Sequence, residues 1–275
     1  MTNATEWIAV GALGEAFGPH ANLLPQLQNL SGTSLELQLE DGTACELQLL
    51  STTQLRWRTT QRRPGSDLRV ADVTASYRAT EIRPGIVLLS FVPSEVSASA
   101  ITAVLDRNRG IATVVLGQLP SPTEAAETLL ERIDRGAELT SVRATFLAGA
   151  IDASMTPATA RHEETRELIG KRVEYTYSST ERYEHIYLNE AFYCWHCLAG
   201  SEKGLADTDR CHYRKIAPDL YLFVWREKIV PTLGIVLVDL AQLRTTGQIF
   251  GYRGFDFAAV TSFPVGARAR IVSAT

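Results

Sequence analysis

Hydrophobic and polar residues alternate along most of the chain with a period of two, which is typical of antiparallel strands with one buried face. In the C-terminal half, short turn sequences such as SST, APD and PTLG interrupt the alternation. The pattern there predicts strands at residues 171–177, 182–189, 192–198, 210–216, 219–227, 233–240, 246–252, 257–262 and 268–273. Eight or so antiparallel strands in sequence order suit an up-and-down barrel, which leaves no exposed sheet edge.

The same pattern occurs twice in the chain. Five residues of the N-terminal half recur at a fixed offset of 138: Gly32, Glu36, Glu46, Leu50 and Trp57 match Gly170, Glu174, Glu184, Leu188 and Trp195. A fixed offset indicates duplication of a structural unit. We therefore expect an all-β fold of two tandem antiparallel β-barrels from an internal duplication, with a few short helices.

Helical signals are confined to the region between and before the two copies. SPTEAAETLLERIDRG predicts one helix, with Ser121 as N-cap, Glu124 in the capping-box position and Gly136 after its end. Its apolar stripe is expected to pack on a barrel and consists of Leu129, Leu130 and Ile133. A second short helix is expected at 162–168.

These signals divide the chain into three expected parts. Residues 1–118 form the N-terminal barrel, 119–169 a helical connector and linker, and 170–275 the C-terminal barrel. Residues 13–30, which include Pro19 and Pro25, are expected to make a turn or broken helix that covers the first barrel.

Composition narrows the class of protein without naming an activity. The chain has 275 residues, of which 45% are hydrophobic and 21% charged, and its formal net charge is −4. A soluble globular protein is expected, in the cytoplasm, with no nucleic-acid or membrane partner, because no basic field and no long apolar run is present. No P-loop, G-x-G-x-x-G or G-x-S-x-G motif occurs, which argues against nucleotide enzymes and serine hydrolases.

The cysteines are expected to be thiols rather than metal ligands or disulfides. The C-x-x-C of FYCWHCL lies in a predicted strand, where Cys194 and Cys197 point to opposite faces. Structural zinc favours the same spacing on a tight turn. No metal is expected.

Several motifs resemble a known family. YEHIYLN, EKGLADTDRC, YLFVWREKI and FPVGA together resemble the molybdenum cofactor biosynthesis protein F (MoaF) family, closely in the second copy and more loosely in the first. The family name implies a link to molybdopterin metabolism but names no reaction.

A more distant resemblance concerns the chemistry. GKRVEYTYSSTERYEHIYL followed by LYLFVWRE is similar to the phenolic acid decarboxylases, which are single lipocalin-like (calycin) barrels that act without a cofactor. The resemblance implies two tandem lipocalin-like barrels, and it places the tyrosines of that family on Tyr175, Tyr177 and Tyr183. Its glutamate falls on Glu227. Its catalytic arginine has no direct match, and Lys203 or Arg210 substitutes.

The residues themselves are compatible with acid–base chemistry. Tyr175 and Tyr177 point to the same side of one strand, so both hydroxyls can converge on one substrate group. Glu227 ends the apolar run YLFVW, where burial is expected to raise its pKa. The candidate catalytic residues are therefore Tyr175, Tyr177 and Glu227. The candidate substrate-binding residues are Tyr183, His185, Trp195, Lys203, Arg210 and Trp225.

The first copy serves as an internal control. It has Leu37 and Leu39 at the positions of Tyr175 and Tyr177, and Phe91-Val92-Pro93 where the second copy has Trp225-Arg226-Glu227. We therefore expect the polar site only in the second barrel, with the first barrel structural or binding apolar matter.

Three hypotheses remain open from sequence. The first is a cofactor-free lyase, such as a decarboxylase, or an isomerase, acting on an aromatic or conjugated small molecule in the C-terminal barrel. The second is a non-catalytic ligand-binding or accessory protein linked to molybdenum cofactor biosynthesis. The third is a structural protein with filled barrels. The expected partner is a small-molecule ligand or substrate, and a homodimer is left open.

Overall fold

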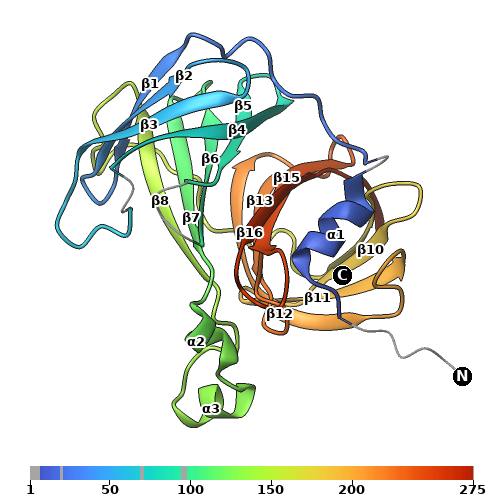
Figure 1. Cartoon of the computed structure of the whole chain (residues 1–275). Helices are drawn as coiled ribbons and strands as arrows, with labels where there is room; N and C mark the ends of the chain where they lie inside the picture. Colours follow the sequence, from blue (N-terminus) through green and yellow to red (C-terminus); the bar gives the residue numbers. More distant parts are fainter. Residues whose placement is uncertain (1–6, 19–20, 69–70, 94–97, 275) are drawn as a thin grey trace, which may run out of the picture. The chain divides into compact units, whose positions relative to one another are not determined.

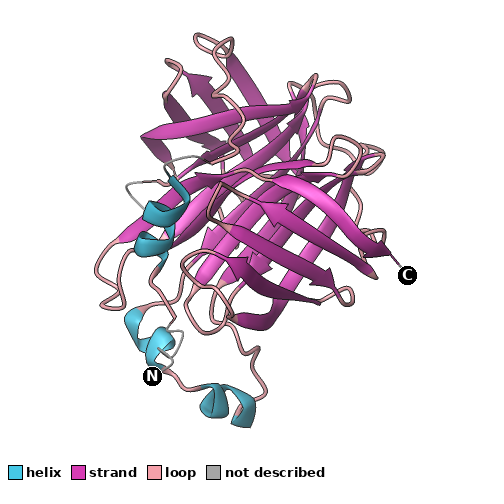
Figure 2. Ribbon diagram, turned by 90° about the vertical axis from the view of Figure 1, so that its right-hand side faces the viewer, coloured by secondary structure: helices cyan, strands magenta, loops and turns pink. Residues whose placement is uncertain are grey.

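The structure, a computed structural model, describes residues 7–18, 21–68, 71–93 and 98–274, and these consist mostly of antiparallel strands (Figures 1 and 2). The chain forms two compact units. One comprises Leu24–Gln118 and Ala144–Glu163, and the other comprises Met1–Leu23, Leu119–Arg143 and Glu164–Thr275. Each unit contains one closed barrel, as the sequence predicts.

The first barrel is a ring of eight antiparallel strands in sequence order. Its strands are β1 (Ser34–Leu39), β2 (Ala44–Leu49), β3 (Gln54–Gln61), β4 (Asp72–Arg83), β5 (Ile86–Phe91), β6 (Ser99–Asp106), β7 (Ile111–Gln118) and β8 (Arg143–Ile151). Apolar residues at every second position fill the interior, mostly leucine, valine and alanine around Trp57. The interior of this barrel is thus an ordinary hydrophobic core.

The last strand of the first barrel differs from the sequence expectation. Strand β8 lies within 119–169, which was expected to be a helical connector and linker, and it pairs with β1 to close the ring. The helices that precede it belong to the other unit. The chain therefore completes its first barrel only after contributing a segment to the second unit.

The second barrel uses nine strands. They are β9 (Lys171–Thr176), β10 (Arg182–Tyr187), β11 (Phe192–Ala199), β12 (Ala206–Ala217), β13 (Leu220–Arg226), β14 (Thr232–Asp239), β15 (Arg244–Tyr252), β16 (Val260–Val265) and β17 (Arg268–Ala274). The ring closes where β14 pairs with β15 and where β17 pairs with both β15 and β9. Strand β16 pairs with the remainder of β15.

The two barrels repeat each other in register as well as in strand order. The antiparallel partners match at the offset of 138: Glu36–Glu46 with Glu174–Glu184, and Leu47–Trp57 with His185–Trp195. Gly32 and Gly170, which precede the first strand of each copy, both have positive φ angles, 79° and 82°. A side chain is strained in that conformation, which explains why both copies have glycine there.

The connector contains two short helices instead of one. Helix α2 (Pro122–Ala126) begins at Ser121 with the expected capping box to Glu124, and helix α3 (Leu129–Asp134) begins at Thr128 with a second capping box. The second cap interrupts the predicted helix because the backbone of an N-cap residue is extended. The predicted packing of its apolar stripe is wrong, since Leu130 is 73% and Ile133 is 56% exposed.

Residues 162–168 do not form the expected helix. Glu164 instead makes an isolated β-bridge with Arg214, and the His162 ring shares a 2.9 Å hydrogen bond with the hydroxyl of Thr113. His162 thus packs on the first barrel, and residues 167–170 form a turn instead of a helix.

The N-terminal segment also departs from expectation. The segment from Leu24 to Leu30 belongs to the first unit, where Leu30 is part of the core. Helix α1 (Val10–Phe17), however, contacts β15 and β16 of the second barrel. The backbone N–H of Gly11 donates a 3.2 Å hydrogen bond to the carbonyl of Arg253 at this contact. Pro19 lies outside the described residues.

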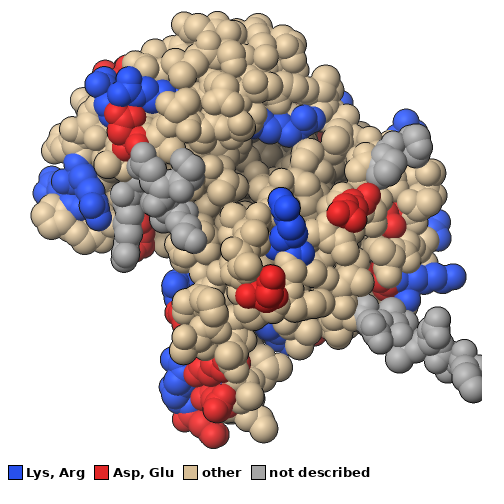
Figure 3. Space-filling view, viewed as in Figure 1, with Lys and Arg blue, Asp and Glu red and all other residues tan. Residues whose placement is uncertain are grey.

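The surface carries charges of both signs. On the face that Figure 3 shows, lysine, arginine, aspartate and glutamate side chains are interspersed among the described residues. Among the described residues, no helix combines the length and hydropathy needed to cross a membrane.

Candidate active site

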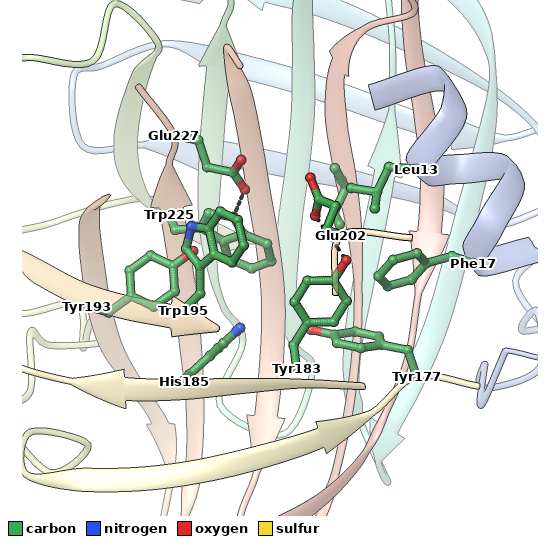
Figure 4. Close-up of a pocket in the computed structure, with 11 residues that line it drawn as sticks. Leu13, Phe17, Tyr177, Tyr183, His185, Tyr193, Trp195, Glu202, Trp225 and Glu227 are labelled. Carbon is green, nitrogen blue, oxygen red and sulfur yellow. Dashed lines mark hydrogen bonds between the residues drawn. The ribbon is translucent and has the colours of Figure 1, made fainter. Parts of the chain in front are cut away.

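A small pocket lies inside the second barrel, closed on one side by helix α1. Its volume of about 30 Å³ is enough for a water molecule or two. The lining residues are Leu13, Phe17, Tyr177, Tyr183, His185, Tyr193, Trp195, Glu202, Trp225, Glu227 and Ile249 (Figure 4). Six of the nine residues predicted from sequence are among them, including Tyr177 and Glu227, two of the three predicted catalytic groups.

Strand periodicity explains why these side chains meet. Tyr183 and His185 are two residues apart on β10, so both point to the same face, and His185 is the antiparallel partner of Trp195 on β11. Trp225 projects inward from β13, and its ring stacks on Phe223 with 5.3 Å between centroids. The alternation seen in sequence therefore becomes the wall of the pocket.

Glu227 follows β13, and its carboxyl group faces the pocket (Figure 4). The indole Nε1 of Trp225 donates a 2.8 Å hydrogen bond to Oε1 of Glu227. Burial raises the pKa of Glu227 well above its ordinary value of 4.5, and the nearby Asp209 and Glu202 carboxylates raise it further. Glu227 is partly buried, and its carboxyl lies on the wall of the pocket.

A second carboxyl group, not predicted from sequence, lies on the pocket wall. Glu202 is 7% exposed and sits in the turn after β11, where the hydroxyl of Tyr183 donates a 3.0 Å hydrogen bond to its Oε2. Burial is the main cause that raises the pKa of Glu202 above 4.5, and Glu181 raises it further. The pocket therefore contains two carboxyl groups with raised pKa values.

The two tyrosines of the predicted catalytic pair have different positions. Tyr177 lines the pocket, and its hydroxyl makes no hydrogen bond to the described residues. Tyr175 lies deeper, 1% exposed, and shares a 2.6 Å hydrogen bond with the hydroxyl of Tyr187. In this structure the two hydroxyls do not share a partner, because the Tyr175 hydroxyl is hydrogen-bonded to another phenol of the core.

His185 is buried in a cage of rings. Its ring lies 4.8 Å from that of Tyr175 and 5.1 Å from that of Tyr193, between centroids. Its Nδ1 atom is fully buried and finds no hydrogen-bond partner among the described residues. Burial lowers the pKa of His185 to about 3, so the imidazole is neutral over the ordinary pH range.

Lys203 and Arg210 do not line the pocket. Lys203 is exposed in the turn between β11 and β12. Arg210 points away from the interior, where it forms a 3.4 Å ion pair with Glu138 and lies 4.6 Å above the ring of Phe192. The sequence does not determine whether Arg210 faces the interior, because a shift of one residue in the register of β12 moves its side chain to the opposite face of the sheet.

Asp209 does not line the pocket, but it holds a residue that does. The indole Nε1 of Trp195 donates a 3.0 Å hydrogen bond to its Oδ2, and the backbone N–H of Lys228 donates one of 3.1 Å to its Oδ1. The ammonium group of Lys228 also contacts Asp207 and Asp209. These contacts fix the ring of Trp195 and place the lysine next in sequence to Glu227 outside the cavity.

Apart from Glu202, the pocket residues missed in sequence are of two kinds. Leu13, Phe17 and Ile249 are apolar residues whose role depends on where α1 docks. Tyr193 lies on β11 two residues before Trp195, so the alternation already places it on the inner face. The sequence signal for Tyr193 is therefore its position as a polar aromatic residue on the inward face of β11.

The cysteines are free, and Cys194 and Cys197 differ in burial, as expected for opposite faces of one strand. Among the residues that the structure describes, no group of three or more histidine, cysteine, aspartate or glutamate side chains is arranged to hold a metal ion.

Fold and pocket together define a duplicated antiparallel β-barrel protein whose second barrel encloses aromatic rings and two carboxyl groups. Family profiles match both halves, the MoaF N-terminal domain at residues 5–121 and the MoaF C-terminal domain at residues 162–275. Protein MoaF of Klebsiella aerogenes is 44% identical over 275 residues, which is 100% of this chain and 98% of that protein. The chain belongs to the MoaF family.

A solved structure described as a putative beta-lactamase from Burkholderia vietnamiensis is also similar in part. It is 15% identical and covers 40% of this chain and 99% of its own, with a TM-score of 0.34. That likeness is too weak to bear on function.

Proposed function

We propose that the second barrel binds a small organic molecule and acts on it by acid–base chemistry centred on Glu227. The observation that carries the proposal is the position of the Glu227 carboxyl, which lies on the wall of a pocket lined by aromatic rings and accepts one indole hydrogen bond. A carboxyl whose pKa is raised well above 4.5 keeps its proton nearer neutral pH, and it can deliver that proton to a bound molecule. Perturbed titratable groups in a pocket are typical of functional sites.

The neighbouring groups suit this role. The hydroxyls of Tyr177 and Tyr193 make no hydrogen bond to the described part of the chain, so they are available to orient a substrate. The neutral His185 offers a buried nitrogen on the same cavity. These groups support a lyase or isomerase reaction on an aromatic or conjugated molecule.

Decarboxylation of a phenolic acid is the less favoured member of this class. In the phenolic acid decarboxylases an arginine takes part at the substrate, whereas no lysine or arginine is among the residues that line this pocket. A substrate carboxylate would meet Glu202 and Glu227 without a compensating cation.

The test is turnover of a panel of conjugated small molecules, followed by absorbance, in wild type, Glu227→Gln, Tyr177→Phe and the exposed control Glu163→Gln. We expect a loss of about 100-fold or more in Glu227→Gln, as for removal of a general acid, and no loss in the control. Equal rates in Glu227→Gln and wild type would remove the catalytic role.

Binding without turnover is the second candidate, since the unpartnered Nδ1 of His185 indicates a ligand contact whether or not a reaction follows. A link of such a carrier to molybdenum cofactor biosynthesis stays a hypothesis from the family name. Mass spectrometry of the purified protein distinguishes the two candidates, because a carrier would release its ligand unmodified.

A further inference from the structure

The ionisable side chains that line the pocket include acids but no lysine or arginine. The acids are the carboxyl groups of Glu202 and Glu227, and six aromatic rings line the pocket beside them. The two basic residues next to Glu227 in sequence are already engaged: Lys228 with Asp207 and Asp209, and Arg226 with Glu138 on the opposite face of its strand. No protein cation therefore balances the two acids within the cavity.

Glu202 and Glu227 interact unfavourably across this cavity. The charge of Glu202 disfavours ionisation of Glu227, and both carboxyl groups are desolvated by burial. Figure 4 shows their carboxyl groups on the same side of the pocket, above the rings of Tyr183 and Trp195. A cation placed at this point would convert the repulsion into two attractions.

His185 gives an independent indication that a ligand belongs here. Its side chain is 5% exposed, and its Nδ1 is buried without a hydrogen-bond partner in the described chain. An unsatisfied buried polar atom is unfavourable by about 1–3 kcal/mol, so its presence in a cavity indicates a partner that the protein does not supply. An N–H group of a ligand would satisfy it.

The aromatic walls suit a cation as well as an apolar body. Positive charge is attracted to the faces of tryptophan and tyrosine rings, and cages of such rings are a common way to bind ammonium groups. At the mouth, the ring of Phe17 lies 4.9 Å from that of Tyr177 and 5.7 Å from that of Tyr183, between centroids. Phe17 thus occupies the place that a ligand's own ring would take.

We propose that the pocket selects an organic amine, bound as its ammonium ion, with the nitrogen between Glu202 and Glu227 and an apolar or aromatic body toward Phe17. This inference names the ligand class of the proposed function and rests on it. A neutral amine that enters takes the proton of the Glu227 carboxyl, leaving a carboxylate paired with the new ammonium. The cavity holds only a water molecule or two. The apolar or aromatic part of the ligand can therefore bind only if Phe17 and α1 shift outward.

The experiment is calorimetric titration of the purified full chain at neutral pH with three probes of the same shape: benzylamine, benzyl alcohol and benzoate. Wild type is compared with Glu227→Gln, Glu202→Gln and the exposed control Glu163→Gln. We expect benzylamine to bind at least about tenfold more tightly than benzyl alcohol, and benzoate to bind most weakly. Each pocket variant should lose about tenfold in benzylamine affinity, and the control should lose nothing.

The outcomes separate this inference from the proposed function. If benzyl alcohol or benzoate binds as tightly as benzylamine, the amine class is wrong, whereas small-molecule binding stands. If benzylamine binds best but equally in wild type and both pocket variants, the two carboxyl groups do not select it and the inference is wrong. If none of the probes binds to wild type or to Phe17→Ala, whose mouth is wider, the inference and the pocket proposal both fail.

Discussion

His185 and Leu47 occupy the same position in the two barrels. Each lies on the second strand of its copy as the antiparallel partner of a tryptophan, His185 of Trp195 and Leu47 of Trp57. Leu47 fills an apolar core, whereas His185 lines a cavity and leaves its Nδ1 unpaired. The duplicated fold thus tolerates leucine at this position, so the histidine is not needed for folding.

His185→Leu is therefore expected to stabilise the protein. Removing a buried, unsatisfied nitrogen should raise the free energy of unfolding by about 1–3 kcal/mol at neutral pH, measured by urea denaturation. The gain should grow on acidification. With a pKa of about 3 in the folded state against about 6.5 when unfolded, His185 binds fewer protons in the folded state, so wild type loses stability as the pH falls through that window.

The reciprocal substitution is the control for this prediction. Leu47→His places an imidazole in the apolar core of the first barrel and should lower the free energy of unfolding by at least about 2 kcal/mol. A loss of stability of similar size in His185→Leu would show that the histidine supports the fold and would contradict the account.

Glu227→Gln should have the opposite pH dependence. The pKa of Glu227 is raised in the folded state, so the folded chain holds more protons than the unfolded chain above about pH 4.5, and wild type loses stability as the pH rises. Glutamine keeps an acceptor for the indole of Trp225 but cannot ionise. The unfolding free energy of the variant should exceed that of wild type at neutral pH by at least about 1 kcal/mol, and match it near pH 3. Parallel stability curves would contradict this.

The docking of α1 depends on a close approach at Gly11. A Cβ atom there would lie 2.5 Å from the carbonyl oxygen of Arg253, so Gly11→Ala must push the helix away from β15. We expect a loss of about 1–3 kcal/mol in unfolding free energy, although alanine favours a helix, together with faster association of a pocket ligand. Gly18→Ala is the matched control, since a Cβ at Gly18 meets nothing within 4 Å. Equal effects of the two substitutions would exclude a tight contact at Gly11.

Phe17→Ala tests whether this side chain fills the ligand's place. Phe17 is 3% exposed, and its removal should lower the free energy of unfolding by about 3–5 kcal/mol if the site does not collapse. The vacated volume should increase the affinity for benzylamine, measured by calorimetry. A weaker affinity than in wild type would show that Phe17 is part of the binding wall instead.

The fold followed from the sequence because strand alternation is a local signal. The nine strands of the second barrel lie within a few residues of the predicted ranges, and the offset from Trp57 to Trp195 revealed the duplication. Strand β8 was missed because it follows the connector helices, and the docking of α1 was missed because its destination is a tertiary contact. Nothing local in VGALGEAF indicates which barrel it covers.

The site was predictable only where strand position determines direction. Tyr183, His185 and Trp195 line the pocket because the register of β10 and β11 places them there, and Tyr177 continues the alternation of β9. Tyr175 obeys the same alternation but lies too deep to line the cavity. Glu202 was not predicted because it lies in a turn, where strand alternation does not determine the direction of a side chain.

Carbon-13 NMR of the Glu227 side-chain carboxyl, assigned by comparison with Glu227→Gln and followed against pH, tests the central claim most directly. The account predicts a midpoint well above 4.5 in the free protein and a fall of that midpoint when benzylamine is bound. A midpoint near 4.5 that the ligand leaves unchanged would mean that the carboxyl is an ordinary solvated acid.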